Sequence, residues 1–227
     1  MTAKLYFNSD ALEGTAVVVG VNDGERKTVR LDRTLFHPQG GGQQADHGSL
    51  VLDAADAVPI RVVDVRHGEN GDIDHIVERL DGLLPGSRVS MRIDASRRRL
   101  NARLHSAGHL IAEVGERLAP GLKACAGHHW PNEARVEFDG HPGDVAAFES
   151  GLVQALHTAV EADVPITVAA DTSTGRQVQV DAGVPVPCGG THVASAAAIG
   201  TIQVRRVQPK GGRLRVSYDL ADRDGSH

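Results

Sequence analysis

The sequence predicts an α+β protein, with a small β-barrel over residues 1–93 and helices packed on an antiparallel sheet over residues 94–227. Three observations support this class. Short strand-like segments separated by turn signals fill the first part. Helical periodicity begins after Asp94, and alternating strands return toward the C-terminus. A chain of 227 residues has room for one large domain or two small ones.

Four segments of the first part have the β-branched or alternating character of strands. The clearest is the last, where Val89, Met91 and Ile93 alternate with polar residues. Several short strands without an intervening helical pattern favour a small barrel. The expected strands are residues 16–19, 27–32, 60–65 and 88–93.

The pattern changes at Asp94, which is placed to cap a helix that runs to about Leu118. A second helix is expected over residues 144–162, where apolar residues recur at helical spacing. Helices that pack on an antiparallel sheet complete the α+β arrangement. The strands of that sheet are expected at residues 135–138, 166–169, 201–207 and 214–220.

The composition excludes several classes of protein. Hydrophobic residues make up 41% and charged residues 23% of the chain, a balance that excludes a disordered protein. No apolar run approaches about 18 residues, so we expect no membrane span. Two cysteines are too few for a disulfide-stapled secreted scaffold, and we expect a cytoplasmic protein. The net charge of −5 argues against indiscriminate binding of polyanions.

Two short motifs offer ligands for a metal ion. His105 and His109 stand four residues apart, so on a helix their imidazoles point from one face. Cys188 and His192 flank a Gly-Gly turn and add a thiolate and a third imidazole. Three nitrogens and one sulfur suit zinc, and the excess of histidine favours a working site over a closed structural one. Glu113 lies four residues after His109 and is a candidate to orient it.

A second motif, FHPQGGGQQ at residues 36–44, contains three successive glycines. Backbone without side chains can adopt positive φ and approach a ligand closely, or its amides can form an anion nest. A flexible hairpin tip is the alternative, and the spacing is not that of a dinucleotide fingerprint. The candidate substrate-binding residues of this motif are Gly40, Gly41, Gly42 and Gln43.

The order of these motifs resembles a known family. A His-x-x-x-His pair, followed after a long gap by CGGTHV at residues 188–193, is similar to the editing domain shared by alanyl-tRNA synthetase and the free-standing AlaX-type proteins. The glycine motif looks like that of the medium-length AlaX class. The resemblance extends from Leu31 to Leu220, and the chain is too short to include an adenylation module.

The resemblance implies a zinc-dependent hydrolase that deacylates mischarged tRNA in trans, with Ser-tRNA(Ala) and also Gly-tRNA(Ala) as substrates. It implies a β-barrel followed by an α+β editing domain. Thr34 matches a family position that helps to accept the serine hydroxyl. The residues that match the catalytic and zinc-binding positions are His105, His109, Cys188 and His192.

Two basic clusters are candidates to contact a tRNA partner. Arg97-Arg98-Arg99 lies at the start of the helix that carries the histidine pair. The second cluster is expected to form a basic rim beside the zinc pocket and to contact tRNA, although a solvated face is the alternative for either. Its members are Arg205, Arg206, Lys210, Arg213 and Arg215.

Three positions depart from the family pattern, because Cys125, Ala196 and Ala198 replace residues that are usually larger or more polar. If they line the pocket, the enzyme is retuned to Thr- or fluorothreonyl-type tRNA; if they only pack the scaffold, the ordinary specificity holds. A non-catalytic, zinc-stabilised tRNA-binding module is a further alternative. The sequence leaves the oligomeric state open.

Overall fold

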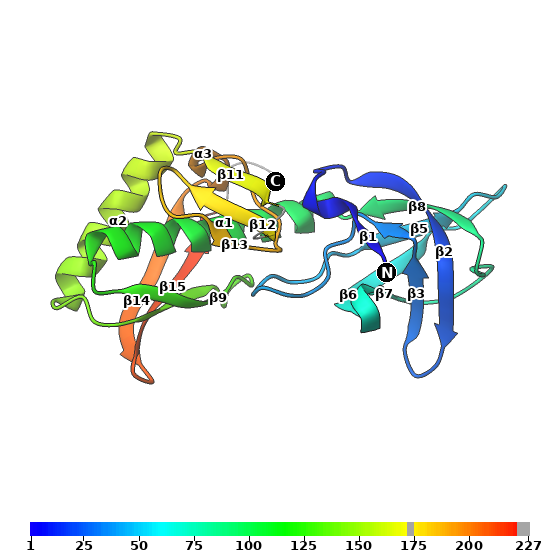
Figure 1. Ribbon diagram of the computed structural model, residues 1–227, viewed down its shortest axis with the longest axis horizontal. Helices are drawn as coiled ribbons and strands as arrows, with labels where there is room; N and C mark the ends of the chain where they lie inside the picture. Colours follow the sequence, from blue (N-terminus) through cyan, green and yellow to red (C-terminus); the bar gives the residue numbers. More distant parts are fainter. Residues whose placement is uncertain (172–174, 222–227) are drawn as a thin grey trace. The chain divides into compact units, whose positions relative to one another are not determined.

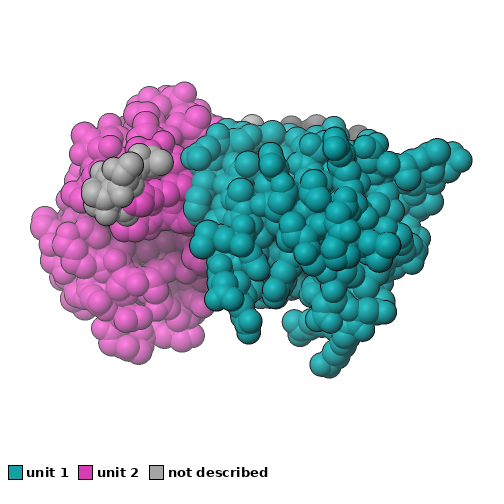
Figure 2. Space-filling model, turned by 45° about the vertical axis from the view of Figure 1, so that its right-hand side comes forward, with its two compact units in different colours: residues 1–40, 44–99 teal, residues 41–43, 100–227 magenta. Residues whose placement is uncertain are grey.

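A computed structural model describes residues 1–171 and 175–221 of the chain. The chain divides into two compact units, which Figure 2 colours separately. Unit 1 comprises residues 1–40 and 44–99, and unit 2 comprises residues 41–43 and 100–227. The short segment 41–43 therefore belongs to unit 2 although both of its flanks belong to unit 1. That 1–93 and 94–227 form separate domains stays a prediction.

Unit 1 is built on a closed six-stranded barrel, which confirms the predicted class. The strands follow the order β2-β3-β7-β6-β5-β8 around the barrel, and every neighbouring pair is antiparallel. The short strands β1 (Ala3–Lys4) and β4 (Arg33–Thr34) form a separate parallel pair. The barrel strands are β2 (Glu13–Asp23), β3 (Lys27–Leu31), β5 (Gly48–Leu52), β6 (Ile60–His67), β7 (Ile73–Val77) and β8 (Arg88–Ile93).

Two polar arrangements lie inside unit 1. Fully buried His75 bonds to the Val29 carbonyl oxygen at 3.0 Å through Nδ1, so Nε2 accepts the proton of the Thr34 hydroxyl at 2.8 Å. Arg98 and Asp46 form a buried ion pair, and Asp46 also accepts the N–H of His37 at 2.6 Å. This pair closes the base of the loop that carries the glycine motif. Removal of one partner of such a pair costs about 3–5 kcal/mol.

Unit 2 contains most of a long helix, α1 (Ala95–Leu118), whose first turn belongs to unit 1. Asp94 caps it as predicted, because its Oδ1 accepts the N–H of Arg97 at 3.0 Å. Asp144 caps α2 (Val145–Glu161) in the same way. The remaining elements are β9 (Lys123–His128), β10 (Arg135–Asp139), β11 (Ile166–Asp171), β12 (Gly175–Val180), β13 (Val186–Pro187), α3 (Ala196–Ile199), β14 (Ile202–Lys210) and β15 (Arg213–Leu220).

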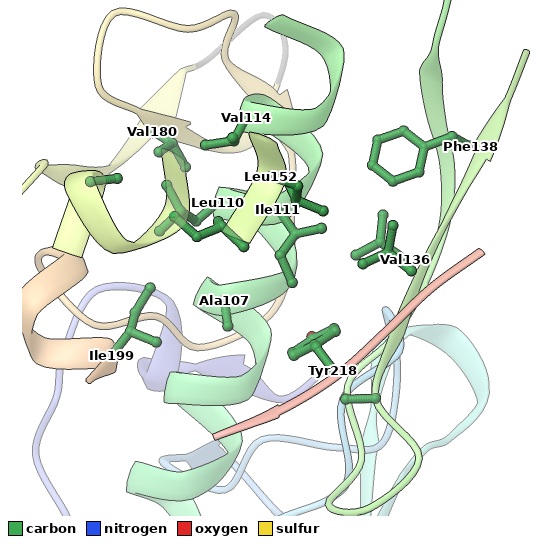
Figure 3. Close-up of a cluster of buried hydrophobic side chains, with 14 of the residues drawn as sticks. Ala107, Leu110, Ile111, Val114, Val136, Phe138, Leu152, Val180, Ile199 and Tyr218 are labelled. Atoms are coloured by element: carbon green, nitrogen blue, oxygen red, sulfur yellow. The ribbon is translucent and has the colours of Figure 1, made fainter. Parts of the chain in front are cut away.

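Helix α1 lies between two antiparallel sheets of unit 2 (Figure 1). One sheet has the strand order β14-β15-β10-β9, and the other has the order β11-β12-β13. Figure 3 shows Ile111 directed toward Val136 and Phe138, whereas Val114 lies next to Val180. Each large apolar side chain buried in this way stabilises the fold by about 1.5–3 kcal/mol. The core therefore fixes the rotation of α1 about its own axis.

In the described ranges, no helix has both the length and the apolar character needed to cross a membrane.

Candidate metal centre and pocket

One face of α1 is directed away from the apolar core and into a pocket. The pocket residues of this helix recur at intervals of three and one, which is the spacing of a single helical face. They are His105, Gly108, His109, Ala112, Glu113 and Glu116. The rings of His105 and His109 stack with centroids 5.0 Å apart and an interplanar angle of 9°. The pair thus faces the pocket in parallel.

The loop that holds Cys188 and His192 is fixed from both sides. The N–H of Cys188 donates to the Arg176 carbonyl at 3.1 Å, and Arg176 returns a bond from its guanidinium to the Cys188 carbonyl at 2.8 Å. At the other end, the N–H of Val193 donates to the Ser106 hydroxyl on α1 at 3.0 Å. These bonds hold the CGGTH turn against the helix face.

The two motifs converge as the sequence predicted. One donor atom from each of His105, His109, Cys188 and His192 lies within 4.8 Å of the others. Cys188 Sγ lies 3.4 Å from Nε2 of His105 and 3.4 Å from Nε2 of His192. No other group of three or more such donors is found among residues 1–171 and 175–221. The structure therefore contains one candidate metal centre in its described part.

The neutral imidazole of His109 fits a metal ion, and the Cys188 thiol would release its proton on binding one. Burial, and then the charge of Arg176, lowers the pKa of His109 to about 4, so its imidazole is neutral at neutral pH. Its Nε2 is buried and has no hydrogen-bond partner among the described residues. Burial raises the pKa of the Cys188 thiol, while the N–H of Gly190 opposes this from 3.5 Å. A cation that accepts the imidazole lone pair and a thiolate would satisfy both residues.

Gln43 orients one of the four ligands. Its Oε1 accepts the Nδ1 proton of His105 at 2.8 Å and the backbone N–H of Thr191 at 2.9 Å. Its amide nitrogen donates to the Thr191 hydroxyl at 2.9 Å. With Nδ1 protonated, His105 presents the lone pair of Nε2 to the centre. Gln43 is fully buried, and its predicted contact with substrate stays a prediction.

Close backbone approach explains two of the glycines. Gly42 has φ of +77°, and a β-carbon there would lie 2.4 Å from the Gly127 carbonyl oxygen. A β-carbon on Gly190 would lie 2.1 Å from the ring of His105. The glycine motif and the CGGTH turn therefore need bare backbone to reach His105 and its surroundings.

Three of the four donors, His105, His109 and Cys188, lie at the wall of a cavity of about 620 Å³ in unit 2. Its wall combines the helix face with strand β9, the segment Gly41–Gly42 and an apolar side. Glu113 lines the cavity, and no hydrogen bond from it to His109 is found in the described part of the chain. The apolar side consists of Val136, Val178, Val180, Val184, Val186 and Pro187. A cavity of this size and character is typical of a small-molecule site.

Only some of the other predicted substrate-binding residues line the cavity. Gly41 and Gly42 line the cavity, whereas Gly40 and Gln43 are not among its described lining residues. Thr34 is fully buried in unit 1, with its proton donated to His75 and its oxygen accepting the N–H of Phe36 at 3.0 Å. Its role toward a serine hydroxyl stays a prediction.

The three residues that depart from the family pattern also differ in whether they line the cavity. Cys125 lines the cavity. Ala196 is fully buried in the core, and neither it nor Ala198 belongs to the described cavity wall. Only the first of the three departures can therefore change the cavity directly.

The C-terminal basic cluster is largely neutralised by acidic neighbours on the same sheet. Arg205 pairs with Asp219, Arg213 with Asp139 and Glu137, and Arg215 with Glu137. Two members, Arg206 and Lys210, are exposed and form no ion pair with the residues that the structure describes. None of the five is found in the described wall of the cavity. The predicted tRNA contact stays a prediction, and these two cations are its strongest members.

The Arg97-Arg98-Arg99 run is not uniformly solvated. Arg98 is 7% exposed and is engaged with Asp46, while the Arg97 guanidinium donates to the Ala45 carbonyl at 2.8 Å. Arg99 is exposed. The central arginine therefore has a structural task within unit 1.

Sequence reasoning missed His129, which lines the same cavity. Its ring stacks on His105 with centroids 4.6 Å apart and an interplanar angle of 20°. Burial is the main cause that lowers the pKa of His129 to about 3. His129 stands at no metal-ligand spacing from the other histidines, so no signal in the sequence marks it. Only the approach of β9 to α1 brings it to the site.

The fold and the site define a class of α+β protein. One unit is a β-barrel, and the other carries three histidines and one cysteine as candidate metal donors beside a cavity. The family described as tRNA synthetases class II (A) matches residues 8–97. The chain is 31% identical over 248 residues to the alanyl-tRNA editing protein AlaX-M of Methanosarcina barkeri, covering 98% of this chain and 100% of that protein. It is 30% identical to AlaX-M of Saccharolobus solfataricus, covering 97% and 99%.

The chain belongs to the AlaX-M family of alanyl-tRNA editing proteins. It is also 29% identical over 251 residues to the alanine–tRNA ligase of Metallosphaera sedula, and the match covers 97% of this chain but 26% of that ligase. The similarity thus reaches nearly the whole chain and a limited part of the ligase.

Proposed function

We propose that this protein is a zinc-dependent hydrolase that deacylates mischarged tRNA in trans, with Ser-tRNA(Ala) as the main substrate and Gly-tRNA(Ala) as a second one. Family membership supports an editing activity, because the full-length relatives are named alanyl-tRNA editing proteins. The cytoplasm, where tRNA is charged, is the compartment in which this activity would be needed.

The convergence of His105, His109, Cys188 and His192, three of which line the cavity, carries the proposal. Three imidazoles and one thiolate suit zinc. When bound, zinc would supply either a water of lowered pKa, near 7, or a hold on the carbonyl or amino group of the ester substrate. The four side chains named here are the candidates to hold it, and a fourth position left open by one of them would take the water or the substrate.

Residues around the donors and along the cavity prepare the reaction without proton chemistry of their own. Gln43 keeps the Nε2 lone pair of His105 directed to the centre. The bare backbone of Gly41 and Gly42 leaves room for the acylated 3′ end beside the donors. The valine-lined side offers apolar surface to the parts of the ester that do not react.

Binding of tRNA is assigned to the C-terminal basic cluster. Arg206 and Lys210 have no acidic partner in the described structure, so each can release a counterion from a phosphate. The ion-paired members Arg205, Arg213 and Arg215 would have to exchange a carboxylate for a phosphate, which lowers their net contribution.

The test is a deacylation panel with tRNA(Ala) charged with serine, glycine, threonine or alanine. Purified protein should release serine and glycine, and should leave alanine in place. A chelator should stop the release, and zinc should restore it. Zinc that is absent from freshly prepared protein, together with activity that resists chelation, would refute the metal dependence. Protein that binds tRNA and zinc but releases none of the four amino acids would support the non-catalytic module.

One observation favours a second substrate class. Cys125 lines the cavity in place of the more polar family residue, and the cavity has an extensive apolar side. The site would then admit a threonine-sized or fluorinated side chain. Threonine released as fast as serine in the same panel would favour this reading.

A further inference from the structure

His129 has a defined place at the cavity but is not one of the converging metal donors. It follows β9 directly, is 5% exposed and lines the cavity beside His105. The donor set consists of His105, His109, Cys188 and His192 only. The position of His129 therefore calls for a task other than binding the metal.

The fold makes room for this ring at two glycines. A β-carbon on Gly108 of α1 would lie 2.2 Å from Cε1 of His129, and one on Gly127 of β9 would lie 2.5 Å from Nε2. Both distances are too short for any side chain. Helix and strand therefore approach one another around the imidazole, which is held with little freedom to rotate.

A chain of hydrogen bonds fixes the tautomer of His129. The Tyr218 hydroxyl donates its single proton to the Leu104 carbonyl at 2.8 Å. It can therefore only accept from Nδ1 of His129, which lies 2.7 Å away. Nδ1 carries the proton, and Nε2 is left as a pure acceptor next to Gly127, which also lines the cavity.

The other polar side chains of the cavity suit different parts of an aminoacyl ester. Glu113 carries a carboxylate that suits an ammonium group, whereas the Glu116 carboxylate is already bonded to Lys123 and to the N–H of Ala124. Apart from the metal donors, His129 is the only neutral nitrogen acceptor among the described side chains of the wall. A neutral acceptor that is buried and cannot donate is suited to a neutral O–H.

We propose that Nε2 of His129 accepts a hydrogen bond from the side-chain hydroxyl of the amino acid on the tRNA, and thereby determines the selection of seryl over alanyl esters. This inference rests on the proposed function. A site built to bond a hydroxyl discriminates against a substrate that lacks it, because its own polar group is then left unpaired. His129 would thus protect correctly charged Ala-tRNA(Ala).

The experiment compares two non-hydrolysable probes, seryl- and alanyl-adenosine with the amino acid joined to the 3′ position through an amide. They differ by one oxygen atom. Calorimetric titration of the zinc-loaded wild type should show about tenfold tighter binding of the seryl probe. In His129→Phe the ratio should fall to about one, while affinity for the alanyl probe stays within about twofold. His129→Gln, which returns an acceptor, should restore part of the ratio.

Two further variants control for an unspecific effect of substitution and for a failure of His129→Phe to fold. His128→Gln alters the neighbouring histidine, which lies outside the described cavity wall, and should keep the wild-type ratio. If His129→Phe does not fold or bind zinc, Tyr218→Phe tests the same idea, because it removes the acceptor that fixes Nδ1–H. The ratio should then fall by about threefold.

The outcomes separate the two proposals. A His129→Phe protein that retains the tenfold ratio would overturn the inference. Equal loss of affinity for both probes would also overturn it, because the contact would then be to a group that both probes share. A wild type that deacylates Ser-tRNA(Ala) without preferring the seryl probe would refute the inference alone. A wild type that binds neither probe and deacylates nothing would refute the proposed function as well.

Discussion

Replacement of Gln43 by methionine should weaken zinc binding although Gln43 touches no metal. Methionine matches glutamine in length but accepts no hydrogen bond, so it removes the bonds to His105 and Thr191, which measure 2.8 and 2.9 Å. The buried Nδ1 proton of His105 would lose its acceptor, and the ring would lose the bond that fixes its tautomer. Loss of such an outer partner costs about 10–100-fold in metal affinity, or about 1.4–2.7 kcal/mol.

The assay is competition for zinc between the protein and a chromogenic chelator. Gln43→Glu retains an acceptor for His105 and for the Thr191 N–H, so its affinity should stay within about threefold of wild type. Gln44→Met, which alters the adjacent half-buried glutamine, is the matched control. Equal zinc affinity in Gln43→Met and wild type would show that these hydrogen bonds do not orient His105 for the metal.

Three more predictions concern the metal, the partner and stability. His109→Ala should reduce turnover by more than about 100-fold and change the Kd for tRNA little, as single-turnover assays and filter binding would show. Arg206→Glu with Lys210→Glu should lower the slope of log K against log salt by about 1.8, whereas Arg215→Gln, already paired with Glu137, should change it little. Burial lowers the pKa of His75 from 6.5 to about 4, so the unfolded chain takes up the proton first as pH falls. As the pH falls from 6.5 to about 4, wild type should therefore lose about 3 kcal/mol more of its free energy of unfolding than His75→Phe, as urea titrations would show. Equal losses in the two proteins would refute this role of His75.

The strands that the sequence predicted have β-branched or alternating residues, and it missed β5, β7, β9 and β12, of which β7 and β9 have identifiable reasons. β7 alternates Ile73, His75 and Val77 toward the barrel interior, but a histidine in the middle hides the apolar pattern. β9 consists largely of alanine and glycine between its ends and has little intrinsic strand preference. Its pairing with β10 supplies what the local sequence lacks.

The candidate site also has a part that could be predicted from the sequence and a part that could not. The spacing of His105 and His109 on a helix follows from local geometry alone, so it could be predicted. The bond between Gln43 and His105 joins residues 62 positions apart, and no local rule brings them together. The ion pairs of the basic cluster follow from strand register, because Glu137 lies opposite Arg215 only once β10 and β15 are paired. A count of positive charges in the sequence could not reveal this neutralisation.

The chain passes between its two units at three places, after Gly40, after Gln43 and after Arg99. A fragment that begins at residue 94 or at residue 100 would contain all four donors and lack the glutamine that sets the tautomer of one of them. The two units therefore cannot be exchanged between relatives through a single junction. An exchange that keeps Gln43 with the His105 of its own chain has to move residues 41–43 together with residues 100–227.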